Sequence, residues 1–259
     1  MSLTLRAGTL LRARAASRPV RPGRAGSGWS RGVWARAGGF GAPQVSRDLK
    51  VPAKLPTVTQ LEWSSPLEIV KYPDPRLRAV NAKVGVFDES LLRLAKEMIE
   101  VMYQDDGVGL AAPQVGINLR LMVFNPDGQG KPGNEAILCN PEIMSMGGQK
   151  VAMEEGCLSF PRIYGRVERP RDVVVRAQNE RGEPVQLQLG KDGGGSEWIA
   201  RIFQHEYDHL QGTLFHDRMS KDVLTTVRDK LVALEDTFEA ANPGVKIQRL
   251  PRPKPQKGF

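Results

Sequence analysis

The histidine pair in His205-Glu206-Tyr207-Asp208-His209 constrains this chain more than any other feature of its sequence. Residues four apart share one face of an α-helix, so a helical segment lets both imidazoles reach the same metal ion. Glu206 lies beside that face, where its carboxylate can handle the proton of a metal-activated water. The pattern therefore predicts a helix in a hydrolytic metal site, although it does not tell which bond is cut.

Flanking residues extend this helix in both directions. Ser196 is a suitable N-cap, and the helix should run over residues 198–211 and end at Gly212. Apolar residues near the histidine pair give the helix a buried side: Ile199, Ile202, Phe203 and Leu210. We therefore expect this helix at the centre of the domain.

Two further helices are predicted by apolar residues at helical spacing. The first follows Asp88 as N-cap and runs to about Gln104. The second begins at Ser220, and the segment Asn242-Pro243-Gly244 ends it. The apolar stripes consist of Leu91, Leu94, Ala95, Met98, Ile99 and Met102 in the first helix, and of Val223, Leu224, Val227, Leu231, Leu234 and Phe238 in the second.

Short apolar runs predict strands at residues 67–70, 119–124, 136–138, 172–177 and 184–189. The turn residues at 179–182 should join the last two strands as a hairpin. This pattern predicts an α+β fold, in which mixed or antiparallel strands pack around the central metal-binding helix. The other two helices should flank that core on the N-terminal and C-terminal sides.

The net charge is unevenly distributed along the chain. A formal charge of +8 over 259 residues first suggests a nucleic acid or a membrane as partner. However, residues 1–47 carry nine arginines and no lysine, aspartate or glutamate, and residues 242–259 carry five basic and no acidic side chains. The remaining 194 residues hold 23 basic and 29 acidic side chains, a net charge of −6. The globular part is mildly acidic, so we expect no DNA partner.

The two ends therefore differ from the middle. An arginine-rich start without acidic residues is typical of an organelle transit peptide, although a basic arm that is never removed has a similar composition. We predict a transit peptide and linker at 1–60, a catalytic domain at 61–241 and a basic, disordered tail at 242–259. No apolar run approaches the ~20 residues needed to cross a bilayer, so we expect no membrane partner.

Two imidazoles need a third protein ligand to form a catalytic metal site with an open position. The downstream candidates are weak, because His216 misses the spacing of the three-histidine zinc proteases by one residue and Glu235 lies in a later helix. Upstream, Cys157 offers a thiolate, which is a strong ligand for Zn²⁺ or Fe²⁺. The alternative is that Cys157 is a small buried hydrophobic residue, the commoner fate of a free cysteine.

A third block, Gly107-Val108-Gly109-Leu110-Ala111-Ala112-Pro113-Gln114, combines small residues with one amide. Small residues let the backbone approach another group closely, and the Gln114 amide can donate a hydrogen bond without carrying charge. A tight connection between a helix and a strand, with Gln114 exposed, would explain the same residues.

Together, the three blocks resemble the signature motifs of the peptide deformylase family: GxGxAAxQ, EGCLS and QHExDH. They occur here, in that order, as residues 107–114, 155–159 and 204–209. The resemblance covers residues 67–241, which is essentially the whole predicted domain. Residues 155–161 and 201–207 look most like the type 1B, plastid-associated branch.

The resemblance implies a metal site with an acid–base residue beside it. One divalent ion, Fe²⁺ in the family as a rule and Zn²⁺ as a common replacement, would be held by Cys157, His205 and His209. Glu206 would act first as general base and then as general acid. Glu155 and Arg169 would form a supporting ion pair behind the cysteine.

The resemblance also implies how the substrate is bound. The Gln114 amide and the backbone N–H of Leu158 would bind the formyl oxygen. Gly109, with Gly107 beside it, would contact the substrate backbone. Candidate walls of the methionine pocket are Tyr164, Ile202 and Phe203.

The implied reaction is removal of the N-terminal formyl group from formyl-methionyl nascent polypeptides, with release of formate. Such substrates emerge from an organellar ribosome, so the ribosome near its exit tunnel is an implied partner. The plastid stroma is the implied location. The arginine-rich N-terminus fits the mitochondrial matrix as well, which leaves that alternative open.

Two other functions are compatible with the histidine pair alone. A zinc endopeptidase would cleave inside peptides and would carry its third ligand downstream of His209. A non-enzymatic module would hold a structural metal in a closed site with four ligands. Neither alternative explains Gln114 and the glycines that precede it.

Overall fold

The computed structural model describes residues 55–193 and 195–251, so the predicted transit peptide lies almost entirely outside the described residues. Its helices are α1 (Glu89–Gln104), α2 (Glu197–Leu210) and α3 (Lys221–Ala241). Its strands are β1 (Thr57–Val58), β2 (Lys83–Val84), β3 (Gly109–Ala111), β4 (Leu121–Phe124), β5 (Ala136–Met146), β6 (Lys150–Gly156), β7 (Tyr164–Pro170), β8 (Asp172–Gln178) and β9 (Pro184–Gly190).

Five strands form one antiparallel sheet in the order β3-β4-β5-β8-β9. β3 is an edge strand of this sheet, paired only with β4. β6 and β7 form a separate antiparallel hairpin, and β1 and β2 form a short parallel pair. Together with the helices this confirms the predicted α+β fold with mixed strand directions.

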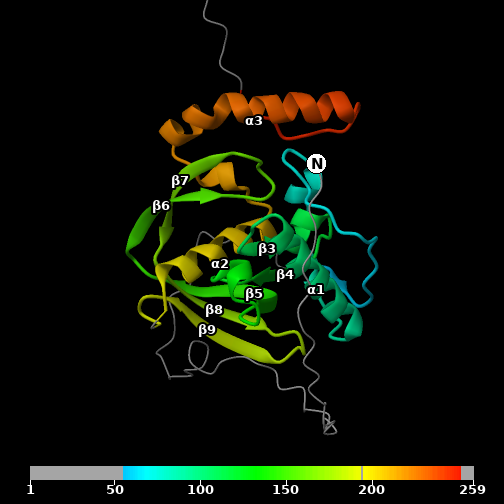
Figure 1. Ribbon diagram of the computed structural model, residues 1–259, viewed down its shortest axis with the longest axis vertical. Helices are drawn as coiled ribbons and strands as arrows, with labels where there is room; N and C mark the ends of the chain where they lie inside the picture. The colour runs from blue at the N-terminus through cyan, green and yellow to red at the C-terminus, as the bar shows by residue number, and fades with distance from the viewer. Residues whose placement is uncertain (1–54, 194, 252–259) are drawn as a thin grey trace, which may run out of the picture.

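Helix α2 lies between the five-stranded sheet and the β6–β7 hairpin, as Figure 1 shows. Its apolar side packs on the sheet, where Phe203 and Leu210 join a buried cluster with Phe124 and Val175. The central position predicted for the histidine-bearing helix is therefore confirmed. Because the hairpin covers the opposite side, every residue of α2 from Ala200 onward is buried.

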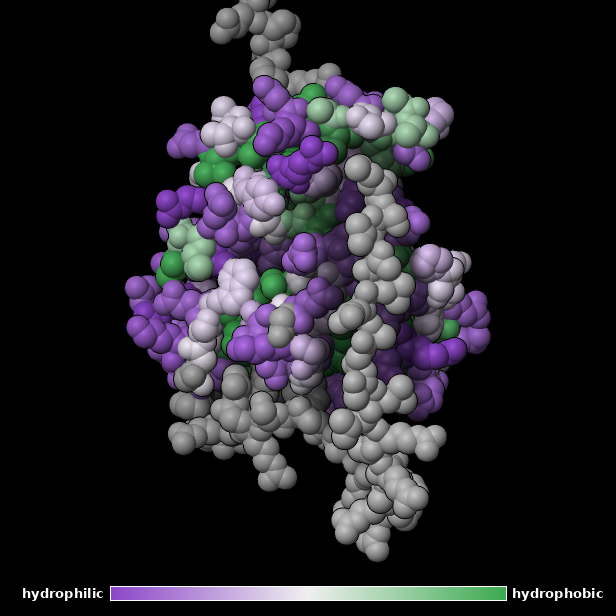
Figure 2. Space-filling view, viewed as in Figure 1, coloured by the Kyte–Doolittle hydropathy of each residue, from purple (hydrophilic) through white to green (hydrophobic). Residues whose placement is uncertain are grey.

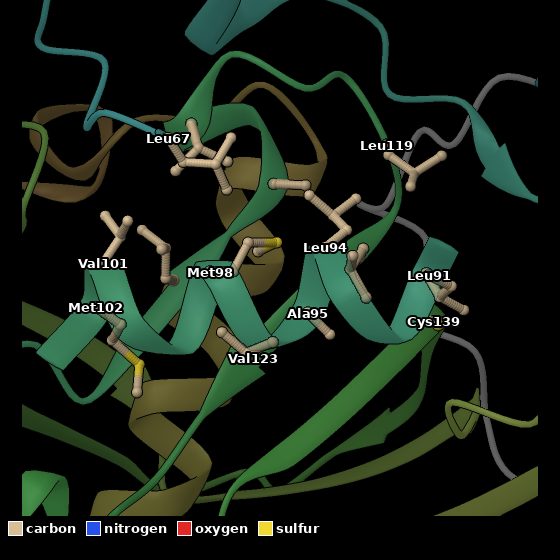
Figure 3. Packing of buried hydrophobic residues seen from close by; sticks show 14 of the residues in the cluster. Leu67, Leu91, Leu94, Ala95, Met98, Val101, Met102, Leu119, Val123 and Cys139 are labelled. Carbon is tan, nitrogen blue, oxygen red and sulfur yellow. The ribbon is translucent and has the colours of Figure 1, made fainter. Parts of the chain in front are cut away.

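Helix α1 packs against β3 and β4 through the predicted apolar stripe. Figure 3 shows side chains of this stripe, among them Leu94 and Met98, lying against Leu119 and Val123. Cys139 is fully buried in the same cluster, as a small apolar residue.

Both predicted N-caps, Asp88 and Ser196, are confirmed, and Ser220, the predicted start of the last helix, is also an N-cap. The Asp88 carboxylate accepts from the Ser90 N–H at 2.9 Å, and the Ser196 hydroxyl accepts from the Trp198 N–H at 3.0 Å. Ser220 caps α3 through the Val223 N–H at 3.4 Å. A side-chain acceptor at these positions satisfies a backbone donor that has no partner within the helix, which explains why the helices begin where they do.

The sequence did not predict the β6–β7 hairpin. The inward-facing positions of these strands include Glu155 and Arg169, both buried. Charged residues on the buried side remove the alternation of apolar and polar residues from which a strand is predicted. The strand predicted at 67–70 is also wrong, because this segment is not part of any sheet in the described chain.

Both predicted domain boundaries need correction. Residues 57–58 pair with residues 83–84 as β1 and β2, so the last part of the predicted linker belongs to the domain. At the other end, Leu250 is 8% exposed and packs in a cluster with residues of α3. Disorder from Asn242 onward is therefore wrong for residues up to 251, because Leu250 supplies an apolar anchor among basic residues. Residues 252–259 lie outside the described chain.

Most of the surface visible in Figure 2 is hydrophilic, and hydrophobic areas gather at the level of α3. Among the described residues, no helix combines the length and apolar character that a membrane span requires.

Candidate metal centre

The structure brings Cys157, His205 and His209 together, with one ligand atom of each lying within 4.8 Å of the others. The two histidines come from successive turns of α2, and their ring centroids lie 5.3 Å apart. Cys157 follows the end of β6, and its Sγ lies 3.4 Å from Nε2 of His209. The hairpin thus delivers the thiol to the histidine face of the helix.

The chemistry of these three groups fits a divalent transition metal. One thiolate and two imidazoles suit Zn²⁺ or Fe²⁺, and three protein ligands leave a position open. His209 is 1% exposed, and burial followed by the neighbouring His205 lowers its pKa well below its ordinary value. This ring is therefore neutral, as a metal ligand must be.

The surroundings of His205 are negative. Burial alone would lower its pKa, but Cys157 and Glu155 beside it raise that pKa well above the ordinary value. His205 Nδ1 lies 3.0 Å from Glu155 Oε2, which fixes the ring and leaves its Nε2 for the metal. A site that favours positive charge on a buried imidazole also favours a cation at that place.

An ion-pair network holds this carboxylate from behind. Arg169 Nε donates to Glu155 Oε1 at 2.7 Å, which confirms the predicted pair. Arg169 Nη1 also donates to Asp208 Oδ2 at 2.7 Å, and Arg201 Nη1 donates to Glu155 as well. Burial would raise the pKa of Glu155, but its bonds to His205 and Arg169 hold it well below the usual range.

Sequence reasoning missed Asp208 and Arg201 as members of this network. Asp208 lies within the histidine motif, and its buried carboxylate also accepts from Arg218 Nη2 at 2.5 Å. Arg201 lies one helical turn before His205 on α2. The sequence did contain a signal for both: Arg201 and Asp208 are charged residues at positions of α2 that its amphipathic pattern predicts to be buried.

The Gln114 amide has a defined orientation. Its Oε1 accepts from the Ala111 N–H at 2.8 Å, so its Nε2 is presented to the cysteine segment. Nε2 lies 3.6 Å from Cys157 Sγ and 3.4 Å from Ser159 Oγ. Gln114 is buried, so the alternative of an exposed glutamine in a plain connection is wrong.

Glu206 is 4% exposed, and its Oε2 has no hydrogen-bond partner among the described residues. Burial raises the pKa of this carboxyl to about 7, against the opposing charges of His205 and Arg169. Its Oε1 lies so close to Gly109 that a Cβ there would be 2.5 Å away. Glycine at 109 therefore makes room for the Glu206 carboxylate.

Most of these groups line one cavity of about 590 Å³, whereas His209, Arg169 and Asp208 are not part of its wall. Its wall includes the following residues predicted for the site: Gly107, Gly109, Gln114, Cys157, Leu158, His205 and Glu206. Tyr164 and Ile202 also line it, as expected of pocket residues. Phe203 does not, because it faces the sheet in the core cluster.

The two weaker ligand candidates lie elsewhere in the structure. The His216 ring packs against Tyr72 and Phe160, and its Nε2 lies 3.3 Å from Arg78 Nη2. Glu235 is fully buried and accepts from the Tyr72 hydroxyl at 2.5 Å. Neither belongs to the cysteine–histidine cluster.

The sequence is similar to those of known peptide deformylases. The family model for polypeptide deformylase matches residues 66–224. The chain is 47% identical over 196 residues to the chloroplastic/mitochondrial peptide deformylase 1B of Arabidopsis thaliana, which covers 76% of this chain and 70% of the relative. A peptide deformylase of Thermotoga maritima is 43% identical over 169 residues, which is 65% of this chain and 96% of the relative.

Solved structures show the same relationship. The crystal structure of a plant peptide deformylase of type 1B aligns with a TM-score of 0.66 at 48% identity, over 71% of this chain and 96% of that one. A peptide deformylase of Plasmodium falciparum aligns with a TM-score of 0.63 at 42% identity, over 68% of this chain and 99% of that one. Because the family model spans more than half of the sequence and the type 1B relatives align along it, the chain belongs to the peptide deformylase family, on its type 1B branch.

Proposed function

We propose that the cavity at the cysteine–histidine cluster is where this chain carries out the reaction of its family, removal of the N-terminal formyl group from nascent polypeptides. The main support for this assignment is that residues far apart in the sequence meet in one cavity. Residues from three sequence blocks, at 107–114, 155–159 and 204–209, line the same cavity. Sequence motifs that lie far apart along the chain thus supply one reaction site.

We assign the metal to Cys157, His205 and His209, with Fe²⁺ as the native ion and Zn²⁺ as a replacement. The compact cluster of these three residues and the negative environment of His205 support this assignment. A divalent ion, when bound, lowers the pKa of a water molecule and polarises a carbonyl oxygen.

Glu206 is the proton carrier in this proposal. Its buried carboxylate has one oxygen without a partner in the described chain, and it lines the cavity beside His205. It takes a proton from the attacking water as the oxygen adds to the formyl carbon. It then gives a proton to the amine nitrogen as the C–N bond breaks, which releases formate and a free N-terminal methionine.

Gln114 Nε2 and the Leu158 N–H stabilise the negative charge that develops on the formyl oxygen. Gln114 is preorganised, because the Ala111 N–H fixes its other amide atom. The Leu158 N–H has no acceptor within residues 55–193 and 195–251, so it is available to a substrate oxygen. Donors that are fixed before the reaction need no rearrangement when the charge forms.

The substrate backbone would lie along β3, with Gly109 and Gly107 at the contact. Support comes from the edge position of β3, whose second side is unpaired in the described sheet. An extended peptide can add to such an edge through backbone hydrogen bonds. Tyr164 and Ile202 line the same cavity and are candidate contacts for the methionine side chain.

Three cysteine and glutamate variants test this assignment. Cys157→Ala should lose both bound metal and formate release from a formyl-methionyl peptide, whereas Glu206→Ala should keep the metal and lose the activity. Cys139→Ala is the matched control, since this second cysteine is buried in the core away from the cavity. Normal metal content and activity in Cys157→Ala would contradict the proposed site.

The location and the ribosome are further proposals. Plant relatives with chloroplastic or chloroplastic/mitochondrial names, together with the acid-free N-terminus, support the plastid stroma, with the mitochondrial matrix as the alternative. Imaging residues 1–60 fused to a fluorescent protein tests this choice, and mitochondrial signal alone would contradict it. Nascent-chain substrates support an encounter near the ribosomal exit tunnel, which co-sedimentation with organellar ribosomes tests.

A further inference from the structure

A short segment before η1 (Pro75–Arg78), residues 70–72, joins the two loops that carry the proposed oxyanion donors. The Val70 N–H donates to the Gln114 carbonyl at 2.7 Å. Two positions on, the Tyr72 N–H donates to the Ser159 carbonyl at 2.9 Å. We call residues 70–72 the bridging segment, because its backbone connects the Gln114 loop to the cysteine loop, residues 157–159.

The bridging segment also fixes the peptide group that follows Leu158. Lys71 Nζ donates to the Leu158 carbonyl at 2.9 Å, and the Cys157 carbonyl accepts from the Phe160 N–H at 2.9 Å. All three carbonyls of the cysteine loop therefore have donors, two of which come from the bridging segment. A loop fixed at its carbonyls has its N–H groups fixed as well, including the Leu158 N–H that would face the formyl oxygen.

Tyr72 ties the bridging segment to the C-terminal part of the chain. Its ring stacks on Phe160 with centroids 4.9 Å apart, and its hydroxyl donates to Glu235 Oε1 at 2.5 Å. The same carboxylate oxygen accepts from the Leu250 N–H at 2.8 Å. Helix α3 and the segment after it thus hold Tyr72 through residues that are not part of the cavity wall.

Glu235 has no part in the reaction proposed above, yet it is 0% exposed among apolar residues. A buried carboxylate is costly to desolvate, and an apolar residue of similar size would often stabilise the fold at least as well. Its Oε2 lies 4.0 Å from Arg249 Nη1 and has no hydrogen bond among the described residues. The bonds that this side chain does make are to Tyr72 and Leu250, which indicates that positioning these two residues is its role.

We propose that Tyr72 and Glu235 are positioning residues for deformylation: they hold the bridging segment, and through it the cysteine loop, in register with Gln114. The proposal rests on the function assigned above, because it gives a purpose to the alignment of Gln114 and Leu158. On this proposal, full catalytic activity requires α3 and residues 245–250 as well as the residues around the cavity.

Substitutions at Tyr72 and Glu235 test this linkage in the full chain loaded with metal. Tyr72→Phe removes the hydroxyl and keeps the stacked ring, so kcat for a formyl-methionyl peptide should fall about tenfold with little change in KM. This is a fraction of the ~10²–10³ that follows complete loss of an oxyanion donor. Glu235→Ala should act similarly, whereas Glu235→Gln retains an acceptor oxygen and should restore most of the rate.

Hydrogen exchange gives a readout of loop order that does not depend on activity. The Phe160 amide reports on the cysteine loop, because it donates to the Cys157 carbonyl. Its exchange should be faster by about tenfold in Tyr72→Phe, as expected when a local opening becomes easier. The double variant Tyr72→Phe/Glu235→Ala should be little worse than the worse single variant, because both break one linkage.

Glu97→Ala is the matched control. Glu97 also joins an aromatic donor and a backbone N–H, accepting from Trp63 Nε1 at 2.8 Å and from the Leu67 N–H at 2.9 Å, but it makes no contact with the cysteine loop. It should leave kcat and the Phe160 exchange rate unchanged, even if the melting temperature falls.

The inference is overturned if Tyr72→Phe keeps the unmodified kcat and Phe160 exchange rate, or if Glu235→Gln is as impaired as Glu235→Ala. Loss of kcat in the Glu97→Ala control would also overturn it, since general loosening would then suffice. Absence of formate release from the unmodified, metal-loaded chain would instead contradict the proposed function, and Phe160 exchange would still report on the linkage.

Discussion

Replacing Gly109 by alanine should separate catalysis from stability in this enzyme. The added Cβ would lie 2.5 Å from Glu206 Oε1 and 3.0 Å from its Cγ and Cδ. Real side chains essentially never come closer than 3.0 Å, so the carboxylate oxygen must move by at least about 0.5 Å. The residue that must move is the one to which we assign proton transfer.

The expected effect on rate follows from this displacement. A misplacement of ~1 Å in a reacting geometry can cost ~10²-fold, so a shift of about half that size should lower kcat roughly tenfold or more. The effect on stability should be small, because the clashing atom is the far end of a flexible side chain. The change also removes the extra freedom of glycine in the unfolded chain, so the free energy of unfolding should stay within about 1 kcal/mol.

The assay compares formate release and thermal unfolding for Gly109→Ala, Gly148→Ala and the unmodified protein. Gly148 is the control, because a Cβ there would meet nothing within 4 Å. It should leave both quantities unchanged. A kcat within threefold of the unmodified value in Gly109→Ala would refute the reasoning, as would a rate loss that merely follows the unfolded fraction.

The metal site, the turn at Gly107 and the buried His216 ring should each respond to a defined change. Glu155→Gln keeps the shape beside His205 but removes the buried charge, so metal affinity in a chelator competition should fall about 10–100-fold. Gly107→Ala would place its Cβ 2.9 Å from the Met102 backbone oxygen, which cannot easily yield, so urea unfolding should show a loss of about 1–3 kcal/mol. Burial lowers the pKa of His216 to about 4, so its neutral ring contributes stability that is present above pH 6.5 and lost as the pH falls toward 4. Unfolding curves for the unmodified protein and His216→Phe should therefore diverge in that window, by up to about 3 kcal/mol.

The His216 prediction depends on the groups that face its ring. Arg78 Nη2 lies 3.3 Å from Nε2 and disfavours a second positive charge, whereas Asp217 Oδ1 at 3.5 Å favours it. Burial by Tyr72 and Phe160 decides the direction of the shift. An equal loss of stability in both proteins between pH 6.5 and 4.5 would show that His216 does not titrate there.

Local signals in the sequence predicted the helices well. Asp88 and Ser196 each cap a helix as predicted, and Ser220 caps the helix predicted to begin there, because capping involves only a side chain and the backbone two or three residues ahead. The apolar stripe of α1 is buried as predicted, except for Ile99, which is partly buried. Such features are fixed by neighbouring residues, so they can be read without knowledge of the rest of the fold.

Prediction from the sequence failed for segments that are buried in the structure although they carry charged or basic residues. β6 and β7 carry Glu155 and Arg169 on their buried sides, and these two charges stabilise each other only across the hairpin. Leu250 follows the same rule at the C-terminus, where a basic stretch suggests disorder but one apolar residue and one backbone N–H are anchored by α3. Pairing over such separations cannot be recognised from composition or periodicity.

The four-residue spacing of the two histidines is enough to place them on one helical face, and the three motifs pointed to a cysteine as the third ligand. How these groups become a site depends on the packing of the whole domain. It brings Cys157 to within 3.4 Å of His209, fixes His205 through a carboxylate from another element, and makes room for Glu206 at Gly109. The difference lies in sequence separation: a helix face is set by hydrogen bonds between residues four apart, whereas these contacts depend on the packing of β3, β6 and α2 against one another.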